Sequence, residues 1–290
     1  METKSVQQVY SPTTPHMVGD GFKVHNFFPS GTHIDAHRMS PFFLMDYGSK
    51  TIFPPTETPK GVGSHPHRGF ETVTVAYHGR VAHHDSMGNS GIIGEGDVQW
   101  MTAGSGILHK EYHEKEFSRA GGMMQMVQLW VNLPAKHKMT APKYQELTRA
   151  GMGKHELPDG SRIEVIAGEY QGTKGPAFTF TPMHLSNVHL KKGGMVEFVF
   201  PATHNTAMLV LEGSITLNQT SQAPSDHFVL FANAGESISV VADEDSIVLV
   251  LSGEPIDEPI ATYGPFVMNT EQEIREAIED FNAGKFGRLD

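Results

Sequence analysis

Two pairs of potential metal ligands lie in the first half of the chain. His65 and His67 form one pair, and His109 and Glu111 form the other, each with one residue between its members. On a β-strand this spacing places both side chains on the same face, about 6.6 Å apart along the strand. If two such strands face each other, three imidazoles and a carboxylate can converge on one ion. The spacing therefore predicts a mononuclear metal site with three nitrogen ligands and one oxygen ligand.

Each pair taken alone has a plainer explanation. His65 and His67 could simply flank a loop, and His109 could be a core histidine held by hydrogen bonds. Two such pairs on separate segments are harder to explain in this way, so we favour the metal site. Pro66 supports this choice, because proline lacks an N–H and is confined to sheet edges or barrel mouths, where a ligand can enter.

Four further residues in this part of the chain are not predicted to bind the metal. Glu71 has the same parity as the two histidines before it, so we expect it to face inward and to accept a hydrogen bond from a ligand imidazole. His83 and His84 follow a hairpin and are predicted not to be ligands. Arg68 is expected to point to the opposite face and to have a structural role.

Short apolar and β-branched segments alternate with glycine turns through the first half of the chain. This pattern is typical of an all-β barrel or sandwich. The layout around Gly79 and Gly104 returns around Gly213 and Gly235, at nearly equal separations along the chain. The sequence therefore predicts a tandem duplication of one β-barrel.

The second copy lacks the ligand pairs. The glycine offsets place four residues without donor side chains at the ligand positions: Val199, Pro201, Val240 and Ala242. We therefore predict a structural second barrel, filled by its own side chains, and one metal per chain.

Prolines at both ends of residues 134–142 mark a linker. The predicted domains are an N-terminal barrel with the metal site over 1–134 and a C-terminal barrel without metal over 143–268. Thr270 and Glu273 form a capping box, and apolar residues follow at helical spacing. This predicts one α-helix within 269–290 that packs on a barrel.

Composition limits the function further. The chain has no cysteine, so any metal must be bound by nitrogen and oxygen ligands. The formal net charge is -11 at pH 7 and no Lys/Arg block occurs, which argues against direct binding to nucleic acid. The first residues lack the apolar core of a secretory signal, and no apolar run approaches the roughly 20 residues of a membrane span. We expect a cytoplasmic protein without a membrane segment.

Four stretches of the chain resemble the pirin family: residues 65–73, 96–109, 128–134 and 263–270. The resemblance spans nearly the whole chain and implies a bicupin, in which two tandem cupin β-barrels hold one metal in the N-terminal barrel. The family's ligands fall on the same four residues that the spacing selects: His65, His67, His109 and Glu111.

This ligand set favours Fe(II), with Mn, Co, Ni and Cu as alternatives, over Mg or Ca. Bacterial proteins similar to this chain act as flavonol 2,4-dioxygenases. The resemblance thus implies a metal-dependent oxidoreductase of the quercetin 2,3-dioxygenase type, which opens the ring of flavonols with dioxygen and releases carbon monoxide. Glu111 is expected to be both a ligand and the base that takes the proton of the substrate's 3-hydroxyl group.

A regulatory role is the alternative. Animal members of the family resemble nuclear cofactors whose iron oxidation state alters binding to a transcription factor, and bacterial relatives are tied to metabolic enzymes. In this interpretation the chain is a metal- and redox-sensing protein with a protein partner.

Overall fold

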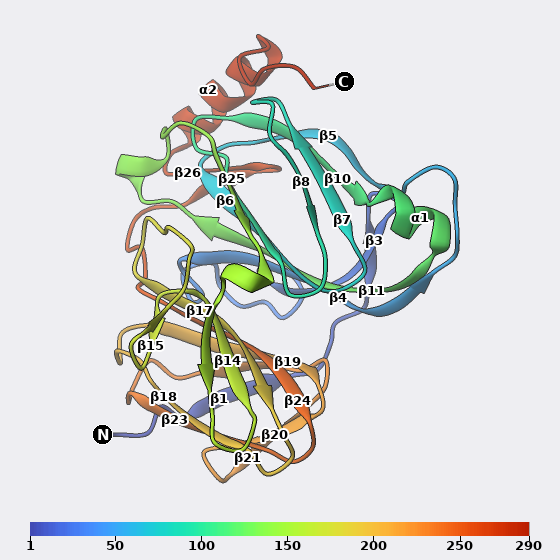
Figure 1. The fold of residues 1–290 in the computed structure, drawn as a ribbon. Coiled ribbons are helices and arrows are strands. Elements are labelled where there is room, and N and C mark those ends of the chain that lie inside the picture. The colour runs from blue at the N-terminus through green and yellow to red at the C-terminus, as the bar shows by residue number, and fades with distance from the viewer. Residues whose placement is uncertain (290) are drawn as a thin grey trace. The chain divides into compact units, whose positions relative to one another are not determined.

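The computed structural model describes residues 1–289, and most of them lie in β-strands or their connecting turns (Figure 1). Each of two compact units contains one seven-stranded and one four-stranded sheet. The N-terminal barrel comprises Thr14–Ala36, Phe42–Arg149 and the residues from Ile256 onward, and the C-terminal barrel comprises Met1–Thr13, His37–Pro41 and Ala150–Pro255. This repeated layout confirms the predicted all-β fold with two tandem barrels.

The N-terminal barrel consists of two antiparallel sheets. Its seven-stranded sheet has the spatial order β12 (Lys143–Leu147), β9 (Val98–Thr102), β6 (Phe70–His78), β11 (Gly122–Asn132), β4 (Phe42–Phe53), β3 (Phe22–Phe28) and β2 (His16–Val18). Its four-stranded sheet has the order β5 (Gly61–His67), β10 (Ile107–His113), β7 (Val81–Asp85) and β8 (Ser90–Ile93).

The C-terminal barrel repeats this arrangement. Its seven-stranded sheet has the order β1 (Val6–Tyr10), β22 (Phe228–Phe231), β19 (Asn205–Glu212), β24 (Ser246–Gly253), β17 (Met183–Leu190), β14 (Arg162–Ala167) and β13 (Gly153–Glu156). Its four-stranded sheet has the order β18 (Met195–Val199), β23 (Ser237–Ala242), β20 (Ser214–Leu217) and β21 (Ser221–Pro224). A short hairpin adds β15 (Glu169–Tyr170) and β16 (Thr173–Lys174).

The helices are few and short. They are α1 (Lys115–Ala120), the 3-10 turns η1 (Ala135–His137) and η2 (Arg149–Gly151), and α2 (Glu271–Asn282). The predicted capping box is present, because Thr270 and Glu273 each accept a hydrogen bond from the other's backbone N–H. No helix within residues 1–289 has the length and apolar character needed to cross a membrane.

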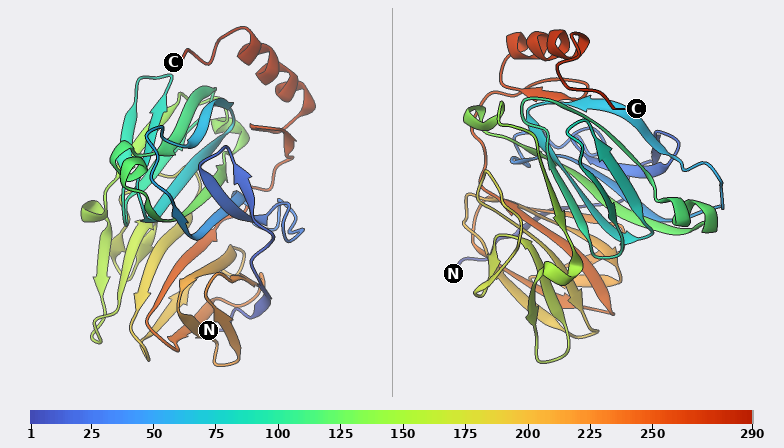
Figure 2. Two further views of the ribbon diagram at one scale, coloured as in Figure 1. Left: turned by 90° about the vertical axis from the view of Figure 1, so that its right-hand side faces the viewer. Right: turned by 45° about the horizontal axis from the view of Figure 1, so that its top comes forward.

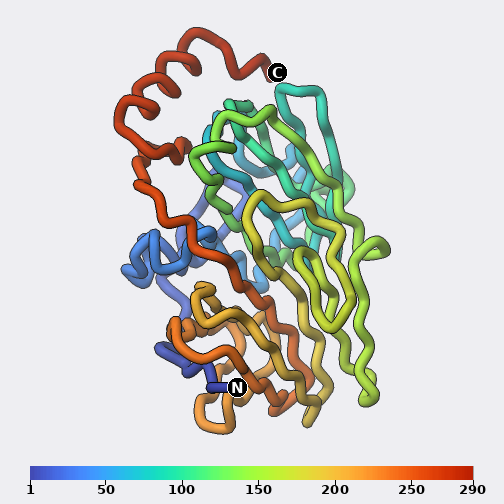
Figure 3. Tube along the Cα trace, turned by 90° about the vertical axis from the view of Figure 1, so that its left-hand side faces the viewer, coloured from blue at the N-terminus to red at the C-terminus, as the bar shows by residue number. Residues whose placement is uncertain are grey.

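The two ends of the chain each belong to the barrel formed mainly by the other half of the sequence. Strand β1 pairs with β22, so the first residues complete the C-terminal barrel (Figure 3). The buried ammonium of Lys4 donates to three backbone carbonyls of that barrel. In return, the hairpin of β25 (Ala261–Tyr263) and β26 (Phe266–Met268) belongs to the N-terminal barrel, and α2 lies beside it (Figure 2).

Strand β10 carries the predicted second ligand pair. Its burial alternates residue by residue: Ile107, His109, Glu111 and His113 are buried, and the residues between them are partly exposed. This period of two is that of a strand with one face on a core. The alternation therefore directs His109 and Glu111 into the barrel.

Candidate metal centre

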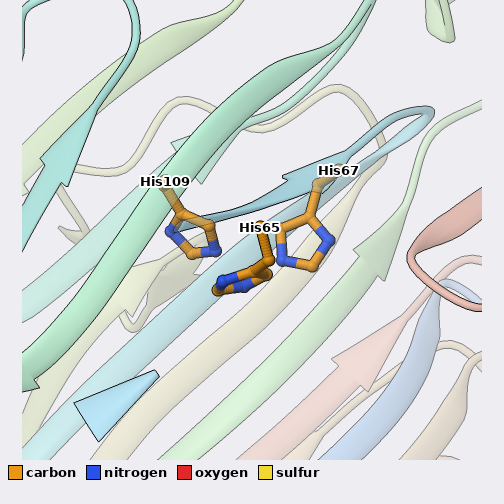
Figure 4. Close-up of side chains that lie close together, drawn as sticks. All are labelled: His65, His67 and His109. Atoms are coloured by element: carbon orange, nitrogen blue, oxygen red, sulfur yellow. The ribbon is translucent and has the colours of Figure 1, made fainter. Parts of the chain in front are cut away.

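Three histidines converge inside the N-terminal barrel. Strands β5 and β10 pair so that His65 lies directly opposite His109. The ring centroids are 4.3 Å apart for His65 and His109, 4.7 Å for His65 and His67, and 4.8 Å for His67 and His109. One nitrogen of each ring lies within 4.8 Å of the other two, and Figure 4 shows the three rings gathered in one place. The structure thus brings together the three histidines that the spacing selected.

Backbone carbonyls fix the orientation of two of these rings. His65 Nδ1 lies 2.8 Å from the Gly63 carbonyl oxygen, and His67 Nδ1 lies 3.4 Å from the Pro265 carbonyl oxygen. A carbonyl only accepts hydrogen bonds, so each Nδ1 donates its proton. The lone pair of each ring is then on Nε2, where a cation can use it.

The third histidine has a buried nitrogen without a partner. Within residues 1–289, nothing forms a hydrogen bond with His109 Nε2. Burial, and then the neighbouring histidines, lower the pKa of His67 and His109 well below the usual value, so both rings are neutral. An unpaired buried polar atom costs free energy. Neutral imidazoles with a free lone pair are the donors that divalent transition metals prefer, so these residues fit a metal ion.

A row of polar side chains crosses the seven-stranded sheet next to these rings. The residues are paired directly from strand to strand in the order Asn26, Asp46, Gln128, Thr74 and Gln99. Directly paired residues share one face of a sheet. The row therefore presents amide, hydroxyl and carboxyl groups to the barrel interior.

Glu111 reaches this row from the four-stranded sheet. Its Oε1 accepts hydrogen bonds from Thr74 Oγ1 at 3.1 Å and Gln99 Nε2 at 2.9 Å, and its Oε2 accepts one from Gln128 Nε2 at 2.8 Å. The potential ligand atoms form two groups and not the single predicted set of four. One group is the histidine triad, and the other consists of His83, His109 and Glu111. His109 is the residue that the two groups share.

His83 is closer to the centre than its place after a hairpin indicates. It lies directly opposite Glu111 in the ladder of β7 and β10, so both side chains face the interior. His84 points the other way and bonds the hydroxyl group of Tyr112. The i, i+2 spacing of His83 and Asp85 is a signal in the sequence that could have located this pair.

Two family descriptions match most of the chain. Residues 21–131 match the description Pirin, and residues 185–287 match the Pirin C-terminal cupin domain. The chain belongs to the pirin family. A Pseudomonas aeruginosa protein named as a candidate quercetin 2,3-dioxygenase is 47% identical over 286 residues, which is 98% of this chain and 99% of that protein.

Solved structures resemble this pirin along most of its length. The crystal structure of a quercetin 2,3-dioxygenase from Acinetobacter baumannii matches with a TM-score of 0.93 and 47% identity, covering 99% of each chain. A bacterial pirin from Escherichia coli in complex with nickel(II) matches with a TM-score of 0.62 and 23% identity, covering 86% of this chain and 99% of that one. The second likeness concerns the fold alone.

Arg68 links the centre of this pirin to its C-terminal segment, which confirms its predicted structural role. Its Nε donates to the Ser105 carbonyl at 2.7 Å, and its guanidinium forms a salt bridge of 2.8 Å with Asp280. The same group lies over the Phe286 ring, 4.8 Å from the centroid. Pro265, which precedes this segment, contacts the site histidine His67 through its carbonyl oxygen, so the C-terminal part of the chain contributes a contact to the centre.

The prediction for Glu71 is wrong. Gly69 has a φ of +87° and separates β5 from β6, so parity does not carry across it. Glu71 is three residues from the inward-facing Thr74, which places it on the other face of β6. There its Oε1 accepts a hydrogen bond from Thr102 at 2.7 Å. Burial raises the pKa of Glu71 to about 7, although Thr102 and Trp100 beside the carboxyl group lower it.

Glu71→Gln is expected to stabilise the protein more at pH 8 than at pH 5. The pKa of Glu71 rises from 4.5 to about 7, so the folded chain keeps a proton that the unfolded chain loses. The stability contributed by this carboxyl group is therefore lost as the pH rises from about 4.5 through about 7. Glutamine cannot ionise, and its gain reaches up to about 3 kcal/mol at pH 8. Denaturant titrations at both pH values measure the change in the free energy of unfolding, and Glu57→Gln, at an exposed carboxylate, is the control. An equal change at pH 5 and pH 8 would contradict the prediction.

The structure also corrects the alignment of the two repeats. Val199 is 54% exposed, so it does not occupy the place of the inward-facing His65. Strand pairing gives a consistent alignment, because β18 pairs with β23 as β5 pairs with β10. The opposed residues His65 and His109 therefore correspond to the opposed residues Phe198 and Ile238. The glycine offsets fail because the segments between equivalent strands differ in length.

The pairing places apolar side chains at all four equivalent positions: Phe198, Phe200, Ile238 and Val240. They replace the predicted set of Val199, Pro201, Val240 and Ala242. All four belong to a cluster of twenty buried apolar residues in the C-terminal barrel. Side chains therefore fill this interior, as predicted, although the residues at the ligand positions differ.

The chain is expected to bind one metal ion. The C-terminal barrel offers phenyl and aliphatic groups at the equivalent positions, and within residues 1–289 the groups of potential ligands all lie in the N-terminal barrel. Elemental analysis of purified, metal-loaded protein measures the ratio directly. A ratio near two would contradict this asymmetry.

Proposed function

We propose that this pirin is a metal-dependent dioxygenase that opens the ring of flavonols such as quercetin. His65, His67, His109 and Glu111 are the proposed metal ligands. The observation that carries the proposal is the buried, unpartnered Nε2 of His109 among neutral imidazoles. The names of the relatives at 47% identity support the reaction type.

The proposed cofactor is one divalent transition metal per chain, with Fe(II) favoured and Mn, Co, Ni or Cu as alternatives. Nitrogen ligands with one carboxylate suit these ions. When bound, such an ion supplies a Lewis-acidic, redox-active centre for a hydroxylated substrate and dioxygen.

A pocket beside Glu111 has the kind of lining that suits an aromatic substrate with hydroxyl groups. Its volume is about 20 Å³, room for about one water molecule, so its walls must move apart to admit a flavonol. Apolar side chains form much of its wall: Val18, Phe22, Val24, Val62, Val81 and Met126. Polar groups line the rest of it: Asp46, Thr74, Glu111 and Gln128. Apolar walls bind the ring faces, and the few polar groups orient the hydroxyls.

Glu111 is the proposed base for the 3-hydroxyl proton of the substrate. Its carboxylate lines the pocket and is positioned by three hydrogen-bond donors from Thr74, Gln99 and Gln128. A base positioned within reach of the proton contributes about 10²–10⁴-fold to the rate.

The direct test uses Fe(II)-loaded protein with quercetin and dioxygen. We expect the visible absorbance of quercetin to decay while an equal amount of carbon monoxide is released. Luteolin, which has the quercetin skeleton without the 3-hydroxyl group, is the matched control and should persist. Quercetin that survives prolonged incubation with fully loaded protein would overturn the proposal and favour the regulatory alternative.

A further inference from the structure

A buried histidine–aspartate pair lies beside the candidate centre. The side chains of His83 and Asp85 are both fully buried, and His83 Nε2 lies 3.2 Å from Asp85 Oδ2. Asp85 Oδ1 accepts from the backbone N–H groups of Met87 and Asn89, and the Asn89 amide contacts both carboxylate oxygens. Burial raises the pKa of Asp85, but the hydrogen bonds from His83 and Asn89 lower it more, so the net shift is downward. The group is therefore an ionised acceptor.

This carboxylate decides which ring nitrogen of His83 carries the proton. An ionised carboxylate can only accept, so His83 donates from Nε2 to Asp85 and keeps its lone pair on Nδ1. That lone pair faces His109 Nδ1 at 3.4 Å and Gln99 Nε2 at 3.3 Å. Both ring nitrogens of His83 are thus engaged, which argues against His83 as a metal ligand.

The lone pair on His83 sets the tautomer of His109. A proton on His109 Nδ1 can be donated to His83, which leaves the buried Nε2 of His109 bare. The other tautomer would oppose two lone pairs at Nδ1 and direct an N–H group toward His65 and His67. Such an N–H group would occupy the position from which a metal receives its lone pair.

The same lone pair orients the amide of Gln99. Because its Nε2 faces His83 and Glu111, its Oε1 accepts from the Tyr144 hydroxyl group at 3.3 Å. Tyr144 also stacks on the His83 ring, with centroids 5.0 Å apart. One buried carboxylate therefore orders the polar groups around two proposed ligands, His109 and Glu111.

The tautomer of His109 depends on the His83–Asp85 pair, whereas the tautomers of the other two histidines do not. His65 and His67 each contact a backbone carbonyl, which can only accept. His109 instead contacts another imidazole, which donates or accepts according to its own tautomer. Only a fixed acceptor behind His83 removes that ambiguity.

We propose that Asp85, acting through His83, is a positioning residue that holds His109 in the tautomer with a free Nε2 for the metal. This inference rests on the ligand set of the proposed function. It assigns Asp85 no contact with the substrate. Its effect is on metal affinity, because a ligand histidine in the wrong tautomer offers no lone pair until its partners rearrange.

Asp85→Asn tests the proposal with little change in shape. The amide oxygen can still accept from the backbone at Met87 and Asn89, while the NH₂ group facing His83 becomes a donor. His83 is then expected to carry its proton on Nδ1, which forces His109 to protonate Nε2. Nitrogen-15 NMR of labelled histidines in metal-free protein reads these tautomers. Affinity for Fe(II), measured by competition with a chelator, should fall about 10–100-fold.

The experiment contains its own control. The tautomers of His65 and His67 should not change in Asp85→Asn, because backbone carbonyls fix them. His84→Ala, on the other face of the same strand, should leave both tautomer and affinity as in the wild type. The proposal is overturned if wild-type His109 carries its proton on Nε2, or if Asp85→Asn leaves tautomer and affinity unaltered. Failure of flavonol turnover would contradict the proposed function without changing these readouts.

Discussion

His109→Ala is expected to lose most of the bound metal and keep the β fold. His109 belongs to both groups of potential ligands, so its loss leaves neither group complete. Outer partners of a metal ligand change affinity by about 10–100-fold, and loss of a ligand should exceed this range. His109 Nε2 has no hydrogen-bond partner within residues 1–289, so removing the imidazole breaks no hydrogen bond at that atom, and the fold should persist. Elemental analysis after loading and desalting measures the metal, and circular dichroism measures the fold.

His84→Ala is the matched control for this variant. His84 lies on β7 but faces away from the centre, where it bonds Tyr112. It should bind metal as the wild type does. Full occupancy in His109→Ala would exclude the site as proposed.

The histidine triad could be predicted because it depends on local periodicity. Spacing of i, i+2 on a strand determines which face a side chain occupies, and β10 alternates in burial along its whole length. Strand and turn signals repeat at similar separations in both halves, so the duplication was also visible. These features require no knowledge of which strands pair.

The contacts that complete the centre depend on pairing between distant segments. His83 reaches Glu111 through the register of β7 against β10, and Pro265 reaches His67 across 198 residues of chain. Propensity and hydrophobic pattern do not encode such registers. The misplacement of Glu71 has a related cause, since a single glycine turn at Gly69 reverses the parity on which the prediction relied.

The exchange of terminal segments could not be inferred from the linker signal. Prolines near 134–142 predicted a boundary, yet β1 joins the C-terminal barrel and α2 joins the N-terminal one. The contacts of Arg68 with Asp280 and Phe286 show how the last segment is held. Each is a pair of residues far apart in sequence, for which the sequence shows no local pattern.

Glu111→Gln is expected to keep part of the metal but lose most of the activity. The glutamine oxygen can replace Oε1, where Thr74 and Gln99 donate, and Gln128 can turn its own amide to accept from the new NH₂ group. The fold should therefore tolerate the change. An amide binds a divalent transition metal more weakly than a carboxylate and cannot take a proton at neutral pH. The turnover rate per bound metal should fall about 10²–10⁴-fold.

The comparison must separate lost metal from lost chemistry. Bound metal and flavonol turnover are measured on the same samples at saturating metal, so that the rate is expressed per loaded site. Glu146→Gln changes an exposed carboxylate of the same barrel and should retain the full rate. If Glu111→Gln turns over substrate as fast per bound metal as the wild type, another group takes the proton. Asp46, the other carboxyl group lining the pocket, would then be the next residue to replace.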